Sequence, residues 1–229
     1  MPAAPDPGFE ARLEAAIQGT RPRYRGWNLN TWCYASWKVV LDPCYRAVAH
    51  QVPPSSLTVD LGSGFGLLAC VLAQLGEGRR VLGVEYDRTK HRAGLRATRD
   101  LPQVHLELGD IRTFPIPACQ TLTCLDVLHY LQVPEQRALL RRAFEALKPG
   151  GRILVRETDA SRQGGTRFTR AFERFALALG FNRGGKPTFR TGEAWAEELR
   201  AAGFQVEASE VAHRLNPGNL LLVGLRPPT

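Results

Sequence analysis

The segment Val59-Asp60-Leu61-Gly62-Ser63-Gly64-Phe65-Gly66 decides the fold of this 229-residue chain. It joins a β-branched apolar run, 57–61, to an apolar run of helical composition, 67–75. Glycines at three alternate positions permit a tight turn and let a ligand approach the backbone closely. The N–H groups that are free at the start of the following helix favour an anionic or polar group. The segment therefore predicts a strand, a ligand-binding loop and a helix in succession.

Short β-branched runs and helical stretches alternate on either side of this loop. Strands are predicted at 57–61, 80–84, 104–108, 122–125 and 152–156, and helices at 67–75, 88–98 and 135–147. The third helix should end at Lys148-Pro149-Gly150-Gly151, which we expect to form a turn. This alternation is typical of a parallel sheet covered by helices on both faces.

After the fifth strand the pattern changes. Helices are predicted at 168–179 and from Thr191 to Gly203, followed by strands at 204–208 and 220–225. The link between these last two strands, 209–219, is too short for a helical crossover. The final pair of strands should therefore be antiparallel.

An acidic residue lies at the end of each of the first four predicted strands or just after it: Asp60, Glu85, Asp110 and Asp126. The carboxyl ends of parallel strands meet at one edge of the sheet, where open α/β sheets bind ligands. An acid at the end of the second strand is the usual partner of ribose hydroxyls. Four acids at one edge favour a binding site over four unrelated, solvated carboxylates.

A dinucleotide-binding loop is the main competing interpretation of the glycine segment. In such a loop the third glycine follows the second by three residues, so that a pyrophosphate passes over the helix N-terminus. Here Gly64 and Gly66 are two residues apart. Asp60, immediately before the loop, would repel a pyrophosphate and attract an ammonium group. An amino acid joined to a nucleoside therefore fits better than a dinucleotide.

The chain resembles the class I S-adenosylmethionine-dependent methyltransferases from about residue 57 to residue 225. The glycine loop and the three later acidic loops carry this resemblance. The resemblance implies an α/β fold: a Rossmann-like, doubly wound sheet of seven strands in the order 3-2-1-4-5-7-6, with strand 7 antiparallel. It also implies S-adenosyl-L-methionine as cofactor, with roles for the following residues. Asp60 and the backbone of Gly62, Gly64 and Gly66 would hold the methionyl part, and Glu85 would bind the ribose hydroxyls. Tyr86 would flank the nucleoside, and Asp110 with Ile111 would contact the adenine. Asp126 and Val127 would begin the loop that closes over the methyl group.

Residues 1–52 are predicted to be a helical, aromatic-rich segment that precedes the cofactor-binding domain, 53–229. Three of the four tryptophans lie between positions 27 and 37, beside Tyr24 and Tyr34. The segment either packs its aromatic side on the domain or serves as a lid over an apolar acceptor, and both alternatives stay open.

Candidate catalytic residues follow the fourth and fifth predicted strands. His129 is the best candidate for a base, because imidazole titrates near neutrality and this loop faces the methyl group in the resembling family. The alternative, a structural histidine hydrogen-bonded at a helix end, stays open. Glu157 could orient or deprotonate an acceptor, or pair with Arg156. Tyr34 could help through its hydroxyl or form a pocket wall. Methyl transfer is an in-line displacement that needs a base only if the acceptor loses a proton.

The sequence indicates a small acceptor. The loop after the fourth strand lacks the Asn/Asp-Pro-Pro-Tyr and Pro-Cys patterns of base-modifying enzymes, and no Asp-Asn pair completes a metal site with Asp126. A narrower resemblance, to the methyltransferases of aryl-polyene and polyketide-type pathways, rests on Lys38, 42–46, 126–131, 156–160 and Phe189-Arg190…Trp195. It implies O- or C-methylation of an aromatic or apolar natural-product-type acceptor, sometimes carried on a protein.

The charge balance leaves other functions open. Lys and Arg total 30 against 22 Asp and Glu, which gives +8. Such an excess either reflects an arginine-rich composition or serves a negatively charged partner. Four residues share one face of a predicted helix, where they are a solvated surface or a docking site for an acidic carrier protein: Arg88, Arg92, Arg96 and Arg99. The alternatives are an RNA or protein methyltransferase that uses the basic surface, and a catalytically silent S-adenosylmethionine-binding subunit.

Compartment and assembly follow from weaker signals. The first residues have no signal-peptide pattern, and no apolar run is long enough to span a bilayer. The five cysteines are scattered without a C-x-x-C pair, which is typical of reduced thiols and not of a disulfide framework or zinc site. We expect a cytoplasmic monomer or homodimer without a metal or a nucleic-acid partner.

Overall fold

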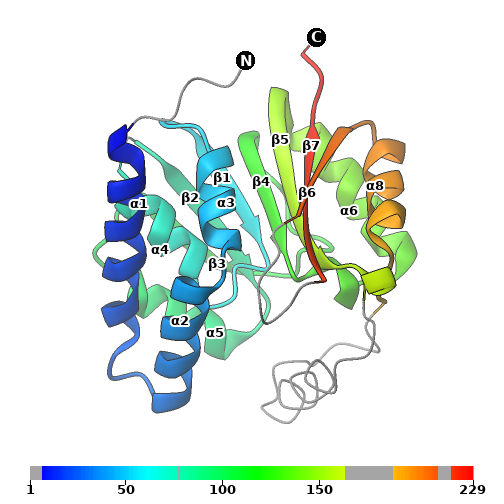
Figure 1. Ribbon diagram of the computed structural model, residues 1–229. Helices are drawn as coiled ribbons and strands as arrows, with labels where there is room; N and C mark the ends of the chain where they lie inside the picture. The colour runs from blue at the N-terminus through cyan, green and yellow to red at the C-terminus, as the bar shows by residue number, and fades with distance from the viewer. Residues whose placement is uncertain (1–6, 77, 163–187, 211–217, 229) are drawn as a thin grey trace.

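The computed structural model describes residues 7–76, 78–162, 188–210 and 218–228 (Figure 1). Its strands form one sheet in the order β3-β2-β1-β4-β5-β7-β6. They are β1 (Leu57–Leu61), β2 (Arg80–Glu85), β3 (Val104–Leu108), β4 (Cys119–Leu125), β5 (Leu147–Thr158), β6 (Gln205–Glu210) and β7 (Asn219–Leu225). Strands β1 to β5 pair in parallel, and β7 is antiparallel to both β5 and β6. The predicted order and the antiparallel last strand are confirmed.

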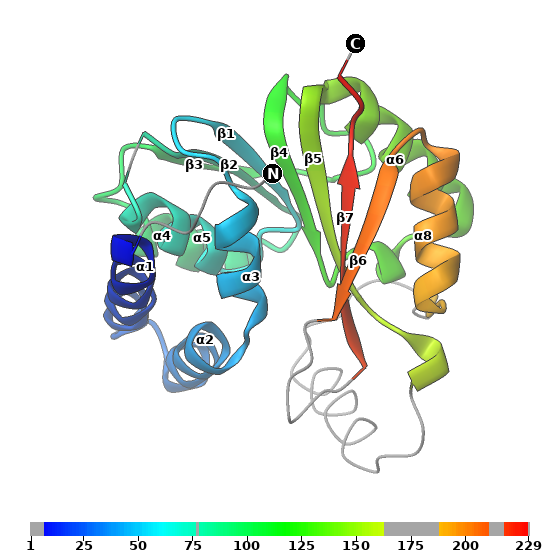
Figure 2. The same cartoon turned by 45° about the horizontal axis from the view of Figure 1, so that its top comes forward.

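Two groups of helices cover the sheet (Figure 2). One group lies over the β3-β2-β1 half and consists of α1 (Pro7–Thr20), α2 (Leu29–Leu41), α3 (Cys44–Gln51), α4 (Leu67–Gln74) and α5 (Arg88–Ala97). The other consists of α6 (Val133–Ala146) and α8 (Gly192–Ala201). Short 3₁₀ turns η1 (Arg21–Tyr24), η2 (Leu128–Tyr130) and η3 (Ala160–Arg162) complete the described elements. The predicted helix at 168–179 lies outside the described residues.

Local chemistry sets where these helices begin. The Asn28 side chain accepts a hydrogen bond from the Thr31 N–H and caps α2, and the Asp87 side chain accepts from the N–H groups of Thr89 and Lys90 at the start of α5. Each cap satisfies a backbone donor that the helix itself leaves unpaired. The capped end of α5 directly follows β2, so this helix begins at the ligand-binding edge of the sheet.

The start of β5 differs from the sequence expectation. Lys148-Pro149-Gly150-Gly151 is part of β5 instead of a free turn, and the β4–β5 register shifts beside it, between Cys119 and Thr121. Gly150 has a positive φ of 75°, and its N–H donates to the Arg226 carbonyl at 3.0 Å. The chain bends here as expected, but tertiary hydrogen bonds to the end of β7 keep it in the sheet.

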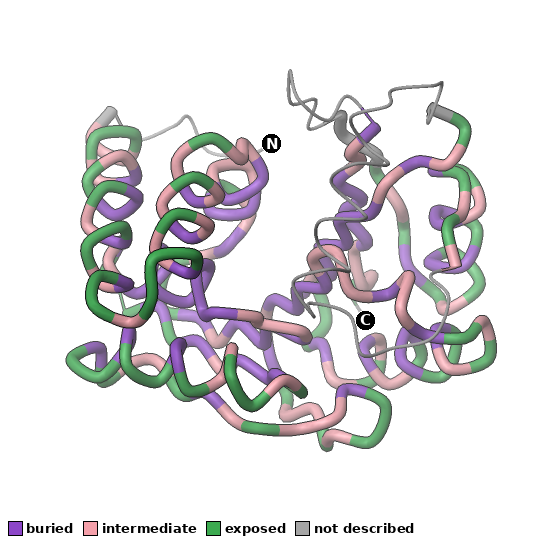
Figure 3. Tube along the Cα trace, turned by 90° about the horizontal axis from the view of Figure 1, so that it is seen from below, coloured by how far each residue is buried: buried purple, intermediate pink, exposed green. Residues whose placement is uncertain are grey.

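The two faces of the sheet have separate apolar cores. Because successive strand residues point to opposite faces, Leu154 of β5 packs with α1 to α4, whereas Ile153 and Val155 pack with α6 and α8. Figure 3 shows the buried positions gathered along the strands and along the sides of the helices that face them. Among the described residues no helix is long and apolar enough to cross a membrane.

The N-terminal helices are part of the first core. Leu13 and Ile17 of α1 are fully buried in the same cluster as Leu68 and Leu72 of α4. Tyr24, also buried, donates a hydrogen bond to the Phe65 carbonyl at 2.8 Å, inside the glycine loop. These contacts show packing of the N-terminal segment on the domain, while its action as a lid stays a prediction.

We predict that Ile17→Ala lowers the free energy of unfolding by about 2–5 kcal/mol, because it leaves a cavity in a shared core. Leu29→Ala is the matched control, since Leu29 is 70% exposed, and it should change stability by less than about 0.5 kcal/mol. Urea unfolding followed by circular dichroism measures both. Equal, small effects would show that α1 does not contribute to the core.

Candidate active site

The β1–α4 loop is tied to β2 and leaves open space at its tip. The N–H groups of Gly62 and Ser63 both donate to the Val84 carbonyl, at 2.8 and 2.9 Å. Gly62, Gly64 and Gly66 have φ values of 80°, 57° and 73°, which side-chain-bearing residues rarely adopt. A Cβ at Gly62 would lie 2.6 Å from Val127 Cγ2, whereas one at Gly64 would meet no atom within 4 Å. Val127 therefore packs on the loop, and Gly64 faces a cradle that a ligand can enter.

Glu85 lies at the tip of this loop, as the sequence predicted. Its Oε2 accepts the Gly64 N–H at 2.7 Å, and its Oε1 accepts the Asp87 N–H at 2.8 Å. The side chain is buried. Because each carboxylate oxygen accepts more than one hydrogen bond, Glu85 is held in place by the backbone and retains capacity for ligand hydroxyls.

Asp60 is a buried acid at the end of β1. Its Oδ1 accepts the Thr123 hydroxyl at 2.6 Å. Burial raises the pKa of Asp60 from 3.8 to about 6, the Thr123 hydrogen bond opposes the rise, and the nearby Glu85 charge adds to it. A positively charged ligand group beside Asp60 would stabilise its ionised form.

The end of β3 carries a different arrangement. The Gly109 N–H donates to the Glu85 carbonyl at 3.0 Å, so this loop lies beside that of β2. Asp110 accepts hydrogen bonds from the Arg112 guanidinium, which holds the pKa of this carboxyl below its usual range. Ile111 is buried and Tyr86 is exposed. Sequence reasoning placed Asp110, Ile111 and Tyr86 at this edge but missed the Arg112 pair.

Asp126 belongs to an ion cluster that links the N-terminal segment to the sheet. The Arg156 Nε donates to Asp126 Oδ1 at 2.8 Å, and its two terminal nitrogens donate to Asp126 and Asp42. Lys38 Nζ lies 3.0 Å from Asp42 Oδ2 and 3.4 Å from Asp126 Oδ2. Asp126 has a φ of 57°, a conformation that costs free energy for a residue with a side chain. We refer to Lys38, Asp42, Asp126 and Arg156 as the ion cluster.

His129 and Glu157 form a second pair, so the alternative of an Arg156–Glu157 pair is wrong. Adjacent residues of β5 point to opposite faces, and Glu157 Oε2 lies 2.6 Å from His129 Nδ1. Glu157 Oε1 accepts the N–H groups of Leu128 and His129 at 2.8 and 3.3 Å. The side chains of His129 and Glu157 are 12% and 2% exposed. With Nδ1–H donating to Glu157, His129 Nε2 is the nitrogen that can accept a proton.

Aromatic rings surround the His129 imidazole. The Tyr130 ring centroid lies 4.0 Å away, and the Phe189 ring lies nearly parallel at 5.5 Å. The Thr188 N–H donates to the His129 carbonyl at 2.7 Å, which joins the 188–190 segment to η2. Tyr34 lies elsewhere at this edge, with its ring 5.5 Å from that of Phe65 in the glycine loop. Its catalytic role stays a prediction.

A sequence profile described as a methyltransferase domain matches residues 45–209, which is most of the chain. The chain belongs to this methyltransferase family. Within the family it resembles the trans-aconitate 2-methyltransferase of Variovorax paradoxus, 33% identical over 122 residues. It also resembles the tetracenomycin polyketide synthesis 8-O-methyltransferase TcmO of Streptomyces glaucescens, 29% identical over 99 residues.

These alignments cover parts of each protein. They span 52% of this chain and 45% of the Variovorax enzyme, and 42% of this chain and 29% of TcmO. The chain thus spans less than half the length of these curated relatives. Human N-acetylserotonin methyltransferase in complex with S-adenosylmethionine has a similar fold, with a TM-score of 0.62 and 21% identity over 96% of this chain and 67% of that one.

S-Adenosylmethionine is the cofactor of this methyltransferase domain, and the described residues fit it. The open cradle at Gly64 admits a ligand against the backbone. The buried Asp60 carboxyl suits an ammonium group, and Glu85 suits ribose hydroxyls. Among the residues that the structure describes, no three His, Cys, Asp or Glu side chains cluster as metal ligands would.

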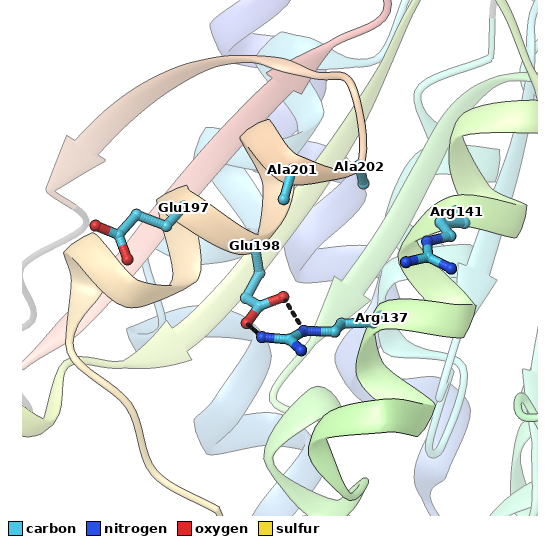
Figure 4. Close-up of a pocket in the computed structure, with 6 residues that line it drawn as sticks. All are labelled: Arg137, Arg141, Glu197, Glu198, Ala201 and Ala202. Atoms are coloured by element: carbon cyan, nitrogen blue, oxygen red, sulfur yellow. Dashed lines mark hydrogen bonds and ion pairs between the residues drawn. The ribbon is translucent and has the colours of Figure 1, made fainter.

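A groove on the outer side of the methyltransferase contains none of these residues (Figure 4). It lies between α6 and α8 and has a volume of about 330 Å³. Arg137 and Glu198 bridge it with two hydrogen bonds of 2.9 Å, and Glu198 also accepts from Arg190 at 2.8 Å. These ion pairs hold α8 against α6 and the 188–190 segment, so they contribute to the packing of the two helices.

We predict that, because of Asp60, the free energy of unfolding falls as the pH rises from about 4 to about 6. The native carboxyl keeps its proton up to about pH 6, whereas the unfolded one loses it near 3.8, so the native chain binds more protons in this window. The loss reaches at most about 3 kcal/mol and should be absent in Asp60→Asn. Urea unfolding across this range measures both proteins. A difference between them that does not change with pH would contradict the assignment.

Proposed function

We propose that the protein transfers the methyl group of S-adenosylmethionine to a small, aromatic or apolar, natural-product-type acceptor, with O- or C-methylation favoured. The observation that carries the proposal is the buried His129–Glu157 pair, which follows directly on a segment that contacts the cofactor loop. Val127 packs on Gly62, and His129 stands two residues further along the same turn. In the proposed function, His129 would accept a proton beside the methyl group of the bound cofactor.

The chain's own residues would act by orientation and proton transfer. When bound, S-adenosylmethionine supplies an electrophilic methyl group. Glu157 fixes the imidazole through Nδ1–H, so that Nε2 can take the proton of an acceptor hydroxyl or activated carbon during attack. The imidazolium that results is stabilised by the Glu157 carboxylate 2.6 Å away. Burial of both groups strengthens this attraction by excluding water.

The surroundings of His129 support an aromatic or apolar acceptor. Tyr130 and the partly exposed Phe189 offer ring faces beside the imidazole, and such faces favour stacking with an aromatic acceptor. The relative TcmO is named for 8-O-methylation in polyketide synthesis. The Variovorax relative is named for a small organic acid, which likewise supports a small-molecule acceptor.

A carrier-bound acceptor is a second candidate. Between positions 88 and 99 the chain has five Lys and Arg residues and no acid. Arg88, Arg92 and Arg96 are exposed on α5, whereas Arg99, which was predicted to share their helix face, is exposed beyond the end of α5 at Ala97. Arg96 Nη1 donates to the Gly26 carbonyl at 3.1 Å, which partly engages this face with the N-terminal segment. The face begins next to Tyr86 at the ligand edge, where an acidic carrier protein would deliver a tethered acceptor close to the site.

We predict that the protein binds S-adenosylhomocysteine and that Glu85→Ala weakens this binding roughly 10- to 100-fold, because charge-assisted hydrogen bonds to the ribose are lost. Glu107→Ala is the matched control, since Glu107 lies on neighbouring β3 and pairs at the surface with His105. Isothermal titration calorimetry measures binding, with NADH as the competing ligand class. Preference for NADH, or no binding at all, would overturn the proposed function.

We predict that His129→Gln and Glu157→Gln each lower kcat for methylation of phenolic acceptors by about 10²- to 10⁴-fold while S-adenosylhomocysteine affinity stays unchanged. His105→Gln is the control, because its exposed imidazole lies on β3. Transfer of radiolabelled methyl groups measures the rate. An unchanged rate in His129→Gln would exclude it as the base, and cofactor binding without turnover of any acceptor would favour a silent subunit.

A further inference from the structure

The inner face of α2 spans both sides of the cofactor loop. Tyr34 and Lys38 are four residues apart and thus share one face of the helix. The Tyr34 ring contacts Phe65, between Gly64 and Gly66. The Lys38 ammonium lies 3.4 Å from Asp126, whose neighbour Val127 packs on Gly62. Lys38 is therefore placed at the Gly62 end of the loop, where the cofactor's amino-acid part would lie.

Lys38 has unused capacity to donate hydrogen bonds. An ammonium group has three N–H donors, and Asp42 and Asp126 account for two within the described part of the chain. Its side chain is 19% exposed, so it reaches solvent from a largely desolvated position. Arg156, in contrast, is 3% exposed and its three nitrogens all donate to carboxylates. Of the two cations in the ion cluster, Lys38 is the one that a ligand can reach.

The negative charges at this edge favour a cationic partner for the cofactor's carboxylate. The amino-acid part carries an ammonium and a carboxylate, and four acidic side chains end the strands around it: Asp60, Glu85, Asp110 and Asp126. Asp60 suits the ammonium, but the same acids repel the carboxylate. Among the described residues, the cations that pair with these acids are Arg112, at the end assigned to adenine, and Arg156 and Lys38 at Asp126.

We propose that Lys38 binds the α-carboxylate of S-adenosylmethionine with its third N–H group. The inference rests on the proposed function and adds a specificity residue to it from outside the strand-end loops. Bound in this way, the cofactor has its ammonium against a β1 acid and its carboxylate against an α2 cation. The cofactor then contributes to holding α2 against the site.

The test compares two ligands that differ in the amino-acid part. S-Adenosylhomocysteine carries the α-carboxylate, and 5′-methylthioadenosine lacks it. By isothermal titration calorimetry, Lys38→Met should bind S-adenosylhomocysteine roughly 10- to 100-fold more weakly than wild type, with unchanged affinity for 5′-methylthioadenosine. Lys148→Met, which removes an exposed lysine at the start of β5, should leave both affinities unchanged. Lys38→Arg should restore part of the loss.

The outcomes separate this inference from the proposed function. Equal weakening of both ligands in Lys38→Met, or no weakening of either, would overturn the inference and show that Lys38 serves the ion cluster alone. If wild type binds neither ligand, the proposed function itself fails. If Lys38→Met does not fold, Lys38→Gln, which keeps an N–H donor without the charge, is measured in the same way with the same expected selectivity.

Discussion

The buried guanidinium of Arg156 holds two carboxylates, Asp42 and Asp126, that belong to different parts of the chain. Removing a charge from water costs several kcal/mol unless partners replace the solvent. Arg156 meets this cost with Asp42, between α2 and α3, and Asp126, at the end of β4. Burial opposes ionisation of Asp42, but the charges of Arg156 and Lys38 outweigh it and hold the pKa of Asp42 well below its usual range. Because loss of either carboxylate would leave the buried Arg156 charge only partly compensated, the pairs favour a fixed relation between the N-terminal helices, β4 and β5. That relation also holds Asp126 at its positive φ and Val127 on Gly62.

The end of β5 divides two tasks between neighbouring residues. Arg156 points toward the N-terminal helices and Glu157 toward η2, because side chains alternate across a strand. One side chain therefore positions the helix that carries Tyr34 and Lys38, and the next orients His129. Since both side chains emerge from one hydrogen-bonded strand, the separation between the ion cluster and His129 is set by backbone geometry. Under the proposed function, such a fixed separation would serve the alignment that in-line displacement requires.

Sequence patterns were informative where the physics is local. Periodicity and the short final link predicted the strands and their antiparallel last pair, and the resemblance to the class I methyltransferases implied the sheet order, which the structure confirms. The position of Glu85 after the second strand predicted that it lies at the ligand edge, where it accepts the Gly64 N–H. Pairings such as Lys38 with Asp126, or Arg156 with Asp42, join residues that are far apart in the sequence, so their proximity arises only from tertiary packing and leaves no spacing signal. Strand alternation alone, however, could have excluded an Arg156–Glu157 pair. The bend at Gly150 was expected, but its place in β5 depends on Arg226, far along the chain.

Each strand-end acid at the site has its charge balanced by a different means. Glu85 accepts two backbone N–H groups, Asp110 pairs with Arg112, and Asp126 pairs with Arg156 and Lys38. Asp60 accepts a hydrogen bond from the Thr123 hydroxyl, and burial raises the pKa of Asp60 to about 6. Among the described residues neither Asp60 nor Glu85 has a cationic partner, and Asp60 also lacks the backbone N–H donors that hold Glu85. A ligand ammonium would supply Asp60 with that partner, whereas a dinucleotide pyrophosphate would add repulsion. The electrostatics of the folded loop thus favour the same ligand class that the glycine spacing and the charge of Asp60 indicated from the sequence.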